Sequence, residues 1–118
     1  MMDIAVPTNK SMGLKIDLQK QLNGIDYKDL IKMCTIDNTL LIDLREESEI
    51  EKKPSLKNST HIPYSSFQRY FKDNEQKLAN KKIIFYCAVG ERSSLAVQIC
   101  QSFKFQNVCH LIGGINNI

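Results

Sequence analysis

The sequence predicts an α/β domain built in three layers, with a central parallel sheet and helices on both of its faces. Three segments, 39–45, 83–87 and 108–112, are nearly continuous apolar runs. Such runs are typical of parallel strands that are covered on both sides. Segments in which apolar residues recur at helical spacing separate these runs. An alternation of strands with helices favours a parallel sheet.

The length and composition are those of one folded domain. The chain has 118 residues, of which 42% are hydrophobic and 25% are charged. These values are typical of a globular protein and argue against disorder. We predict that residues 24–118 form the domain. Residues 1–23 are interpreted as an N-terminal extension, in which residues 14–18 alternate like a short strand.

The charge and hydropathy patterns argue against two classes of partner. The net charge is +3 and the lysines are scattered, so we expect no nucleic-acid partner. No apolar run reaches the roughly 20 residues of a membrane span, and the start of the chain lacks the apolar region of a signal peptide. We therefore expect a cytoplasmic protein with reduced thiols and no membrane partner, acting as a monomer or a weak dimer.

Three helices are predicted from the spacing of apolar residues. Asp26 is the expected N-cap of the first, Ser65 or Ser66 that of the second, and the third follows the loop described next. Segment 46–53 is charged and is interpreted as a short surface helix. The residues expected to face the core are Tyr27, Leu30, Ile31 and Cys34 in the first helix, Phe67, Tyr70 and Phe71 in the second, and Leu95, Ala96, Ile99, Cys100 and Phe103 in the third.

The stretch 83–97 carries the main functional signal. An apolar strand ends at Cys87, a short loop containing one glycine follows, and a helix begins. A parallel sheet presents functional side chains at this edge, where the carboxyl end of a strand faces a helix N-terminus. Backbone amides in such a loop can stabilise a thiolate, the nucleophilic form of cysteine. We predict that Cys87 is a nucleophile, and that the loop around it consists of Ala88, Val89, Gly90, Glu91, Arg92 and Ser93.

The side chains of this loop have separate expected roles. Gly90 allows a tight turn with positive φ. Arg92 is expected to add a positive charge near the thiolate or near an anionic substrate, and Ser93 to cap the helix or donate a hydrogen bond into the loop. Glu91 offsets Arg92 if both face the pocket, and has little effect if it points to solvent.

Other polar residues fall at the same edge of the predicted sheet. Asp43 and Arg45 end the strand 39–45 and are interpreted either as direct participants or as an ion pair that braces the next loop. His61 follows a loop, where a structural role is favoured over a catalytic one. Cys109 and His110 point to opposite faces of their strand. His110 could approach the active edge, although a structural role is favoured for it too.

The cysteines show no metal-binding pattern. Besides Cys87 there are Cys34, Cys100 and Cys109, with no CxxC pair among the four. We interpret these three as buried packing residues. No metal and no cofactor are predicted.

Four ordered segments resemble the motifs of a single-domain rhodanese. Residues 41–49, LIDLREESE, are similar to the family's DVR-x-x-x-E strand and turn, and 61–63, HIP, to the core of its GHIPGA segment. Residues 86–93, YCAVGERS, are similar to its active loop, YC-x-x-G-x-RS, and 108–115, VCHLIGGI, to its closing V-x-x-L-x-GG. The resemblance covers about residues 24–118 and implies a rhodanese-like domain.

The resemblance also implies an activity, a sulfurtransferase that needs no metal. Cys87 would attack the outer sulfur of a small-molecule sulfane donor such as thiosulfate and become a persulfide. A thiol or a protein sulfur acceptor would then take that sulfur, with Asp43, Arg45 and His61 supporting the loop. Ala88 occupies a position where thiosulfate-using members often carry a basic residue, so that with Glu91 the pocket is less positive.

Two alternatives belong to other functional classes. A related cysteine phosphatase of the cell-cycle type, or an arsenate reductase, uses a Cys-x5-Arg loop. Here Arg92 stands five positions after Cys87, so the loop is one residue shorter, and Tyr86 precedes the cysteine where those phosphatases have histidine. The second alternative is a non-catalytic interaction or regulatory module that retains the fold.

Overall fold

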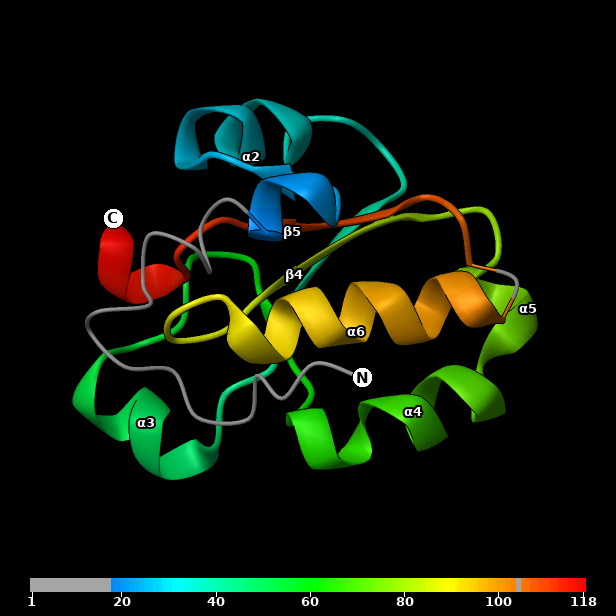
Figure 1. Ribbon diagram of the computed structural model, residues 1–118. Coiled ribbons are helices and arrows are strands. Elements are labelled where there is room, and N and C mark those ends of the chain that lie inside the picture. The colour runs from blue at the N-terminus through cyan, green and yellow to red at the C-terminus, as the bar shows by residue number, and fades with distance from the viewer. Residues whose placement is uncertain (1–17, 104) are drawn as a thin grey trace.

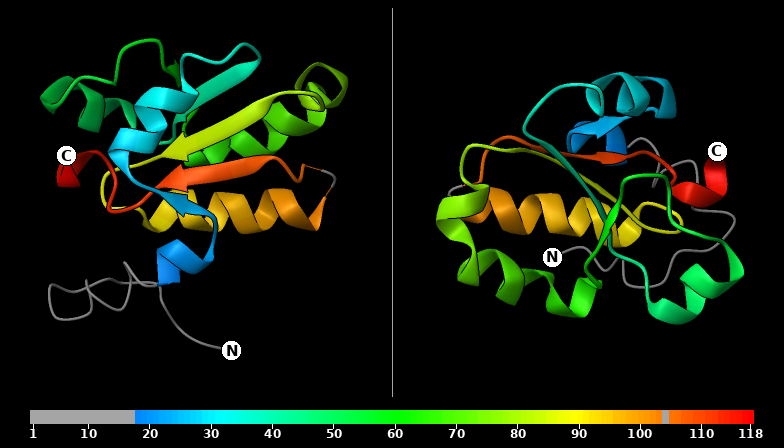
Figure 2. Two further views of the ribbon diagram at one scale, coloured as in Figure 1. Left: turned by 90° about the horizontal axis from the view of Figure 1, so that it is seen from above. Right: turned by 180° about the vertical axis from the view of Figure 1, so that it is seen from behind.

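The computed structural model describes residues 18–103 and 105–118. Within them, five parallel strands form one sheet in the order β1-β5-β4-β2-β3, and Figure 2 shows the strands running side by side. The predicted parallel α/β sheet is therefore confirmed. The strands are β1 (Gly24–Ile25), β2 (Thr39–Asp43), β3 (Thr60–His61), β4 (Lys82–Tyr86) and β5 (Val108–Leu111).

Helices cover both faces of the sheet, as predicted. The helices are α2 (Tyr27–Met33), α3 (Glu47–Lys52), α4 (Tyr64–Asp73), α5 (Glu75–Leu78) and α6 (Glu91–Ser102), and a 3₁₀ turn, η2, spans Ile115–Asn117. Residues 18–21 are also helical. Figure 1 shows α2 on one side of the sheet, with α4 and α6 on the other.

Two apolar clusters, one on each face, hold these layers together. The alternation of β4 divides its side chains, because Ile84 packs with α2 whereas Ile83 and Phe85 pack with α4 and α6. Cys87 follows β4 and continues this alternation, so that it belongs to the cluster under α6. In β5, Val108 lies in that same cluster while Cys109 lies in the α2 cluster. The period of two therefore sends His110 to the α6 face, the face of Cys87.

The predicted helix starts are partly correct. Asp26 caps α2, and its carboxylate accepts a hydrogen bond of 2.8 Å from the Asp29 N–H. Segment 46–53 forms α3, with a capping box between Glu46 and Glu49. The predicted N-cap of α4 is wrong by two or three residues, since the N-cap is Pro63 and the serines lie inside the helix.

Several predicted core positions are wrong. Ile31 and Phe103 are about half exposed, at 48% and 55%. Tyr27, Tyr70 and Cys34 are exposed as well. The exposure of these side chains has simple geometric causes. Helices α2 and α4 are short and bury only a narrow stripe, and Leu30 is the buried residue of α2. Phe103 lies past the end of α6.

Several short elements were not predicted, β3 and α5 among them. Strand β3 has two residues and lies in a segment read as loop, and α5 has four residues in a segment read as a surface connection. The predicted strand at 14–18 lies outside the described residues except for Leu18, which is helical. No helix among residues 18–103 and 105–118 is long and apolar enough to cross a membrane.

Candidate active site

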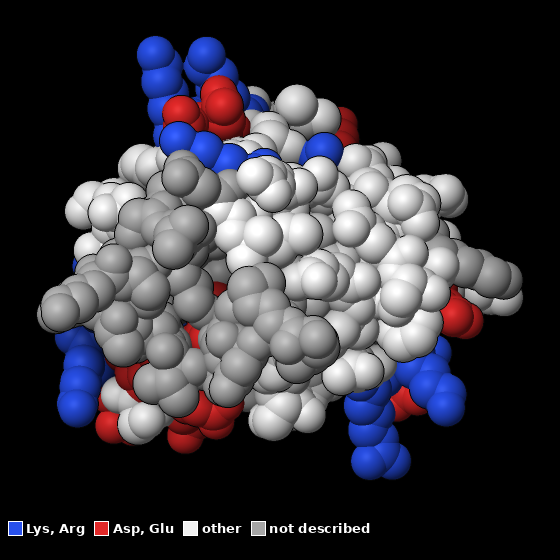
Figure 3. All heavy atoms as spheres, in the orientation of Figure 1, with Lys and Arg blue, Asp and Glu red and all other residues white. Residues whose placement is uncertain are grey.

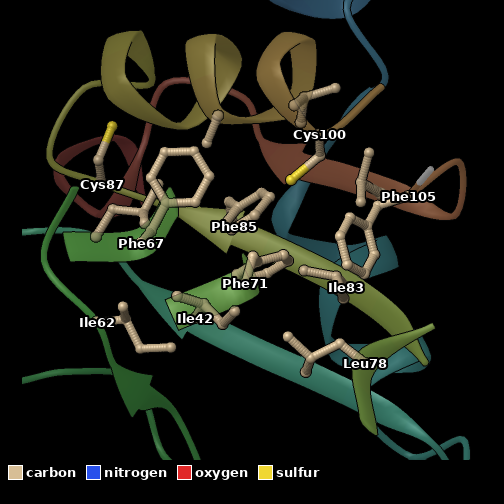
Figure 4. Packing of buried hydrophobic residues seen from close by; sticks show 14 residues of the cluster. Ile42, Ile62, Phe67, Phe71, Leu78, Ile83, Phe85, Cys87, Cys100 and Phe105 are labelled. Atoms are coloured by element: carbon tan, nitrogen blue, oxygen red, sulfur yellow. The ribbon is translucent and has the colours of Figure 1, made fainter. Parts of the chain in front are cut away.

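The sequence places Cys87 immediately after β4, at the carboxyl end of the sheet. Its side chain is completely buried. Figure 4 shows its sulfur directed toward the first turn of α6, away from the sheet. This is the edge at which α/β proteins carry their functional groups.

Backbone amides of the loop hold the sulfur. Cys87 Sγ accepts hydrogen bonds from the Gly90 N–H, at 3.1 Å, and from the Ser93 N–H, at 3.4 Å. Gly90 has a φ of 93° and is the N-cap of α6, so that the loop turns directly into the helix. Two N–H groups at a helix N-terminus form a site for an anion. The predicted cradle is present, and Gly90 and Ser93 supply it.

Ser93 and His110 extend this site into a connected chain of polar groups. The Cys87 thiol donates to Ser93 Oγ at 3.6 Å, and Ser93 Oγ lies 2.9 Å from His110 Nδ1. On the other side of the ring, His110 Nε2 lies 3.2 Å from the carbonyl oxygen of Gln19. Cys87, Ser93 and His110 are each 0% exposed. Cys87 directly follows β4, Ser93 lies in α6 and His110 in β5, and these three elements adjoin at this point.

Arg92 has a partner that the sequence did not reveal. Its two terminal nitrogens donate to the two oxygens of Glu49, at 2.8 Å each. This bidentate pair lowers the pKa of Glu49 to about 2, chiefly through the hydrogen bond from Arg92. The pKa of Arg92 is raised, first by Glu49 and, more weakly, by the charge of Cys87. Arg92 therefore contributes charge to the site while its donors bind Glu49 and hold α3 beside the loop.

Asp43 and Arg45 form a buried ion pair, one of the two interpretations that the sequence allowed. Arg45 Nη2 donates to Asp43 Oδ2 at 2.8 Å, and Arg45 and Asp43 are 2% and 0% exposed. Burial alone would raise the pKa of Asp43, but hydrogen bonds from Arg45 and Ser55 hold it below its usual value. The pair therefore braces the end of β2.

His61 is part of the same brace. Its Nε2 donates to the carbonyl oxygen of Arg45 at 2.6 Å, and Asp43 and His61 are partners in the register of β2 and β3. No hydrogen bond in the described part of the chain joins this group to Cys87. The structure thus brings the loop residues together, and keeps Asp43, Arg45 and His61 as a separate support at the neighbouring strand end.

Comparison with known proteins decides the family. The family model described as "Rhodanese-like domain" matches residues 26–118. The chain belongs to the rhodanese-like domain family. This rhodanese-like domain is 29% identical to a rhodanese-related protein from Thermoplasma volcanium, with a TM-score of 0.64 over 80% of this chain and 88% of that one.

Two other comparisons differ in what they can support. A protein of unknown function from Rhodopseudomonas palustris, described as a possible tyrosine phosphatase, superposes with a TM-score of 0.74 over 99% of this chain and 92% of that one. At 22% identity, it shares the fold alone. The tRNA uridine(34) hydroxylase of Rickettsia prowazekii is 32% identical over 92% of this chain. The chain spans about half of that curated relative, 51% of its length.

The other cysteines of the rhodanese-like domain are placed differently from Cys87. Burial raises the pKa of Cys100 to about 12, and burial is also the main cause that raises the pKa of Cys109 to about 11. Both were expected in the core and are there. Cys34 was expected in the core but is exposed at the end of α2. The described residues hold no group of three or more potential metal ligands from His, Cys, Asp and Glu.

Gln19, like Glu49, is a residue of this site that the sequence does not predict. It is 2% exposed. Its Nε2 donates to the Val89 carbonyl at 3.2 Å, and its Oε1 accepts from the Gly113 N–H at 2.7 Å. A Cβ on Gly90 would collide with this side chain. Gln19 thus joins the active loop to the closing Gly-Gly turn, and the helical spacing of Leu18 and Leu22 was the signal for the turn that carries it.

The burial of His110 gives a testable pH dependence. Burial is the largest cause that lowers its pKa from 6.5 to about 4. Between these two pKa values the imidazole of His110 is protonated in the unfolded chain and neutral in the folded chain. The free energy of unfolding therefore decreases as the pH drops below 6.5. Between pH 6.5 and pH 5 the free energy of unfolding should fall by about 1.6 kcal/mol, measured by urea denaturation.

A matched pair of variants separates this effect from other titrations. His110→Asn should lack this part of the pH dependence, whereas His61→Asn, at the exposed second histidine, should keep it. Glu49 titrates below this range, since its pKa is lowered from 4.5 to about 2. An equal slope in the two variants would contradict the prediction.

Proposed function

We propose that this domain is a sulfurtransferase in which Cys87 carries a sulfane sulfur as a persulfide. One observation carries the proposal: the Cys87 sulfur accepts N–H donors from Gly90 and Ser93 at the end of a parallel strand. Membership of the rhodanese-like family supports the same chemistry. The site uses covalent catalysis with donors that are already in position before the reaction.

The proposed reaction has two steps. The thiolate of Cys87 attacks the outer sulfur of the donor, and a sulfur–sulfur bond forms on Cys87. The bond between that sulfur and the rest of the donor breaks, and its electron pair leaves with the donor remainder, which is sulfite if the donor is thiosulfate. An acceptor thiolate then attacks the outer sulfur of the persulfide and releases Cys87 as a thiolate. We propose a reducing compartment such as the cytoplasm for this reaction, because it depends on a free thiol.

The charge of the site favours a donor whose sulfane group carries at most one negative charge, as the S–SH group of a persulfide does, over one that carries two. The two terminal nitrogens of Arg92 both donate to Glu49. Ala88 adds no positive charge to the loop. A doubly charged anion such as thiosulfate gains less here than it would from an unpaired guanidinium. We therefore propose a low-molecular-weight persulfide or a protein persulfide as the preferred donor, ahead of thiosulfate.

Mass spectrometry tests the proposal directly. The protein is incubated with thiosulfate or with glutathione persulfide, and intact and peptide masses are measured. We expect a gain of one sulfur atom on the peptide that contains Cys87, more complete with the persulfide, and lost when cyanide or a thiol is added. Failure to gain sulfur from either donor would contradict the sulfurtransferase and favour a non-catalytic module.

The Rickettsia relatives motivate a second candidate function. They are named tRNA uridine(34) hydroxylases and are 30–32% identical to this chain, so the domain could be one part of a tRNA-modifying protein. Figure 3 shows Lys and Arg in separate groups at the upper edge and at the two lower edges of one face, each with Asp or Glu beside it, whereas tRNA favours a continuous basic surface. Incubation with unmodified tRNA in air-saturated buffer with a two-electron reductant supplies the oxygen atom and the electrons that hydroxylation requires. Nucleoside mass spectrometry would then detect a hydroxylated uridine and raise this candidate above the first.

A further inference from the structure

We propose that His110 takes the proton of the Cys87 thiol through the hydroxyl group of Ser93. His110 does not touch a substrate, and acts on the nucleophile through Ser93, so it is a positioning residue. This inference rests on the proposed function only in one respect, namely that the thiolate is used to attack a sulfur donor. The formation of the thiolate itself can be measured without any sulfur donor.

The direction of each hydrogen bond follows from the groups involved. The carbonyl oxygen of Gln19 can only accept, so His110 Nε2 carries a hydrogen and donates to it at 3.2 Å. In a neutral imidazole the other nitrogen, Nδ1, then has a free lone pair. Ser93 Oγ, 2.9 Å away, donates its single proton to that lone pair. The serine oxygen is left to accept the thiol proton of Cys87, at 3.6 Å.

The protons of Cys87 and Ser93 therefore both point from the sulfur toward the ring of His110. When the thiol ionises, the S–H bond of Cys87 breaks and its proton bonds to Ser93 Oγ. The original Ser93 proton bonds to His110 Nδ1. Ser93 is unchanged, the sulfur carries one negative charge and the imidazole one positive charge. No oxidant or other reactant is needed.

The surroundings of this relay keep the exchange internal. Cys87, Ser93 and His110 are each 0% exposed, so bulk water has no direct access to the sulfur proton. A buried imidazole holds a proton poorly, as the lowered pKa of His110 shows. An anion formed beside it reverses that preference, because opposite charges stabilise each other strongly in a poorly solvated site.

Four elements pack against His110, and they bring few charges to it. β4 contributes Phe85, the register partner of His110, and β1 contributes Gly24. The turn 18–21 contributes the Gln19 carbonyl. α6 contributes Ser93 and, in the same first turn, the charged residues Glu91 and Arg92, of which Arg92 is paired with Glu49. Cys87 is the titratable group to which the hydrogen bonds of His110 lead.

An internal proton transfer has a distinctive pH signature. The neutral pair and the thiolate–imidazolium pair contain the same number of protons, so their ratio does not change with pH. A fraction of thiolate should therefore persist as the pH falls below neutrality, and disappear only when a second proton binds near pH 4, where His110 titrates beside a neutral thiol. A cysteine that ionises alone loses about tenfold of its thiolate for every pH unit.

Ultraviolet absorbance of the thiolate measures this without a reagent that must enter the site. The pH is varied, and the Cys87→Ser protein serves as the blank for the other three thiols. The unaltered protein should keep at least about one tenth of its alkaline thiolate signal between about pH 5 and pH 7. In His110→Asn, whose amide can accept a hydrogen bond from Ser93 but cannot take a proton, the signal should fall steadily with no plateau.

A second variant covers the case in which His110→Asn does not fold. Ser93→Ala keeps the backbone N–H that binds the sulfur and removes only the hydroxyl, so the plateau should be lost. Ser93→Thr restores a hydroxyl and should restore the plateau. Absence of a plateau in the unaltered protein, or its persistence in Ser93→Ala, would overturn the relay. If the unaltered protein forms the persulfide but shows no plateau, the proposed sulfurtransferase activity would be supported and the proton relay alone would be contradicted.

Discussion

Replacement of the nucleophile, Cys87→Ser, should lower the rate of sulfur transfer by roughly 10⁴-fold or more. A serine hydroxyl in the same cradle is a much weaker nucleophile and cannot form a persulfide. The rate of thiocyanate release from a persulfide donor with cyanide measures the change. Loss of transfer in this variant identifies Cys87 as the residue that carries the sulfur.

The other thiols provide matched controls for that result. Cys34→Ser changes an exposed thiol, and Cys100→Ser changes a thiol on the buried face of α6. Both should keep transfer rates close to that of the unaltered protein, provided that each variant is folded. Full transfer in Cys87→Ser, or its loss in Cys34→Ser, would mean that the reactive sulfur lies elsewhere.

The largest stability effect should come from Asp43→Asn. This change leaves the guanidinium of Arg45 buried, 2% exposed, without its carboxylate. Leaving one member of a buried pair uncompensated costs about 3–5 kcal/mol, which urea denaturation at neutral pH would show as a lower free energy of unfolding. A second change, Arg45→Met, made in the same protein should recover most of that loss, because it removes the stranded charge.

The half-exposed pair beside the active loop is the control for this prediction. Glu49→Gln breaks the ion pair with Arg92. In this pair the Arg92 side chain is 28% exposed and the Glu49 side chain 32%. Solvent screens such a pair, so the loss should be about 1 kcal/mol or less. If Asp43→Asn were no more destabilising than Glu49→Gln, the ion pair of β2 would not be the brace that its burial indicates.

The parts of the fold that the sequence predicted are those with a strong local signal. Strands β2, β4 and β5 are apolar runs buried on both sides, so their composition alone marks them. Strand β3 and helix α5 have two and four residues, which is too short for any period to show. The prediction fails for Ile31 because an apolar residue at the edge of a helix stripe has the same spacing as one in the core, and for Phe103 because the helix ends before it.

The active site was predictable only where its residues are adjacent in the chain. Cys87, Gly90 and Ser93 lie within seven positions, and their spacing is that of a strand, a loop and a helix. The partner of Arg92 is Glu49, 43 residues away. Gln19 is 70 residues from Val89, which it binds. Contacts between residues so far apart in the sequence form only when the whole sheet is assembled, and no local sequence pattern predicts them.

The attachment of η2 to the active loop has a mechanical consequence. The Ile115 N–H donates to the carbonyl of Cys87 at 2.9 Å, and the Asn116 N–H donates to that of Ala88 at 3.0 Å. These bonds fix the rotation of the peptide planes that follow the nucleophile. A force applied to residues 116–118 is therefore transmitted directly to the backbone of the reactive cysteine. A partner that binds residues 116–118 would therefore change the reactivity of Cys87 without contacting its sulfur.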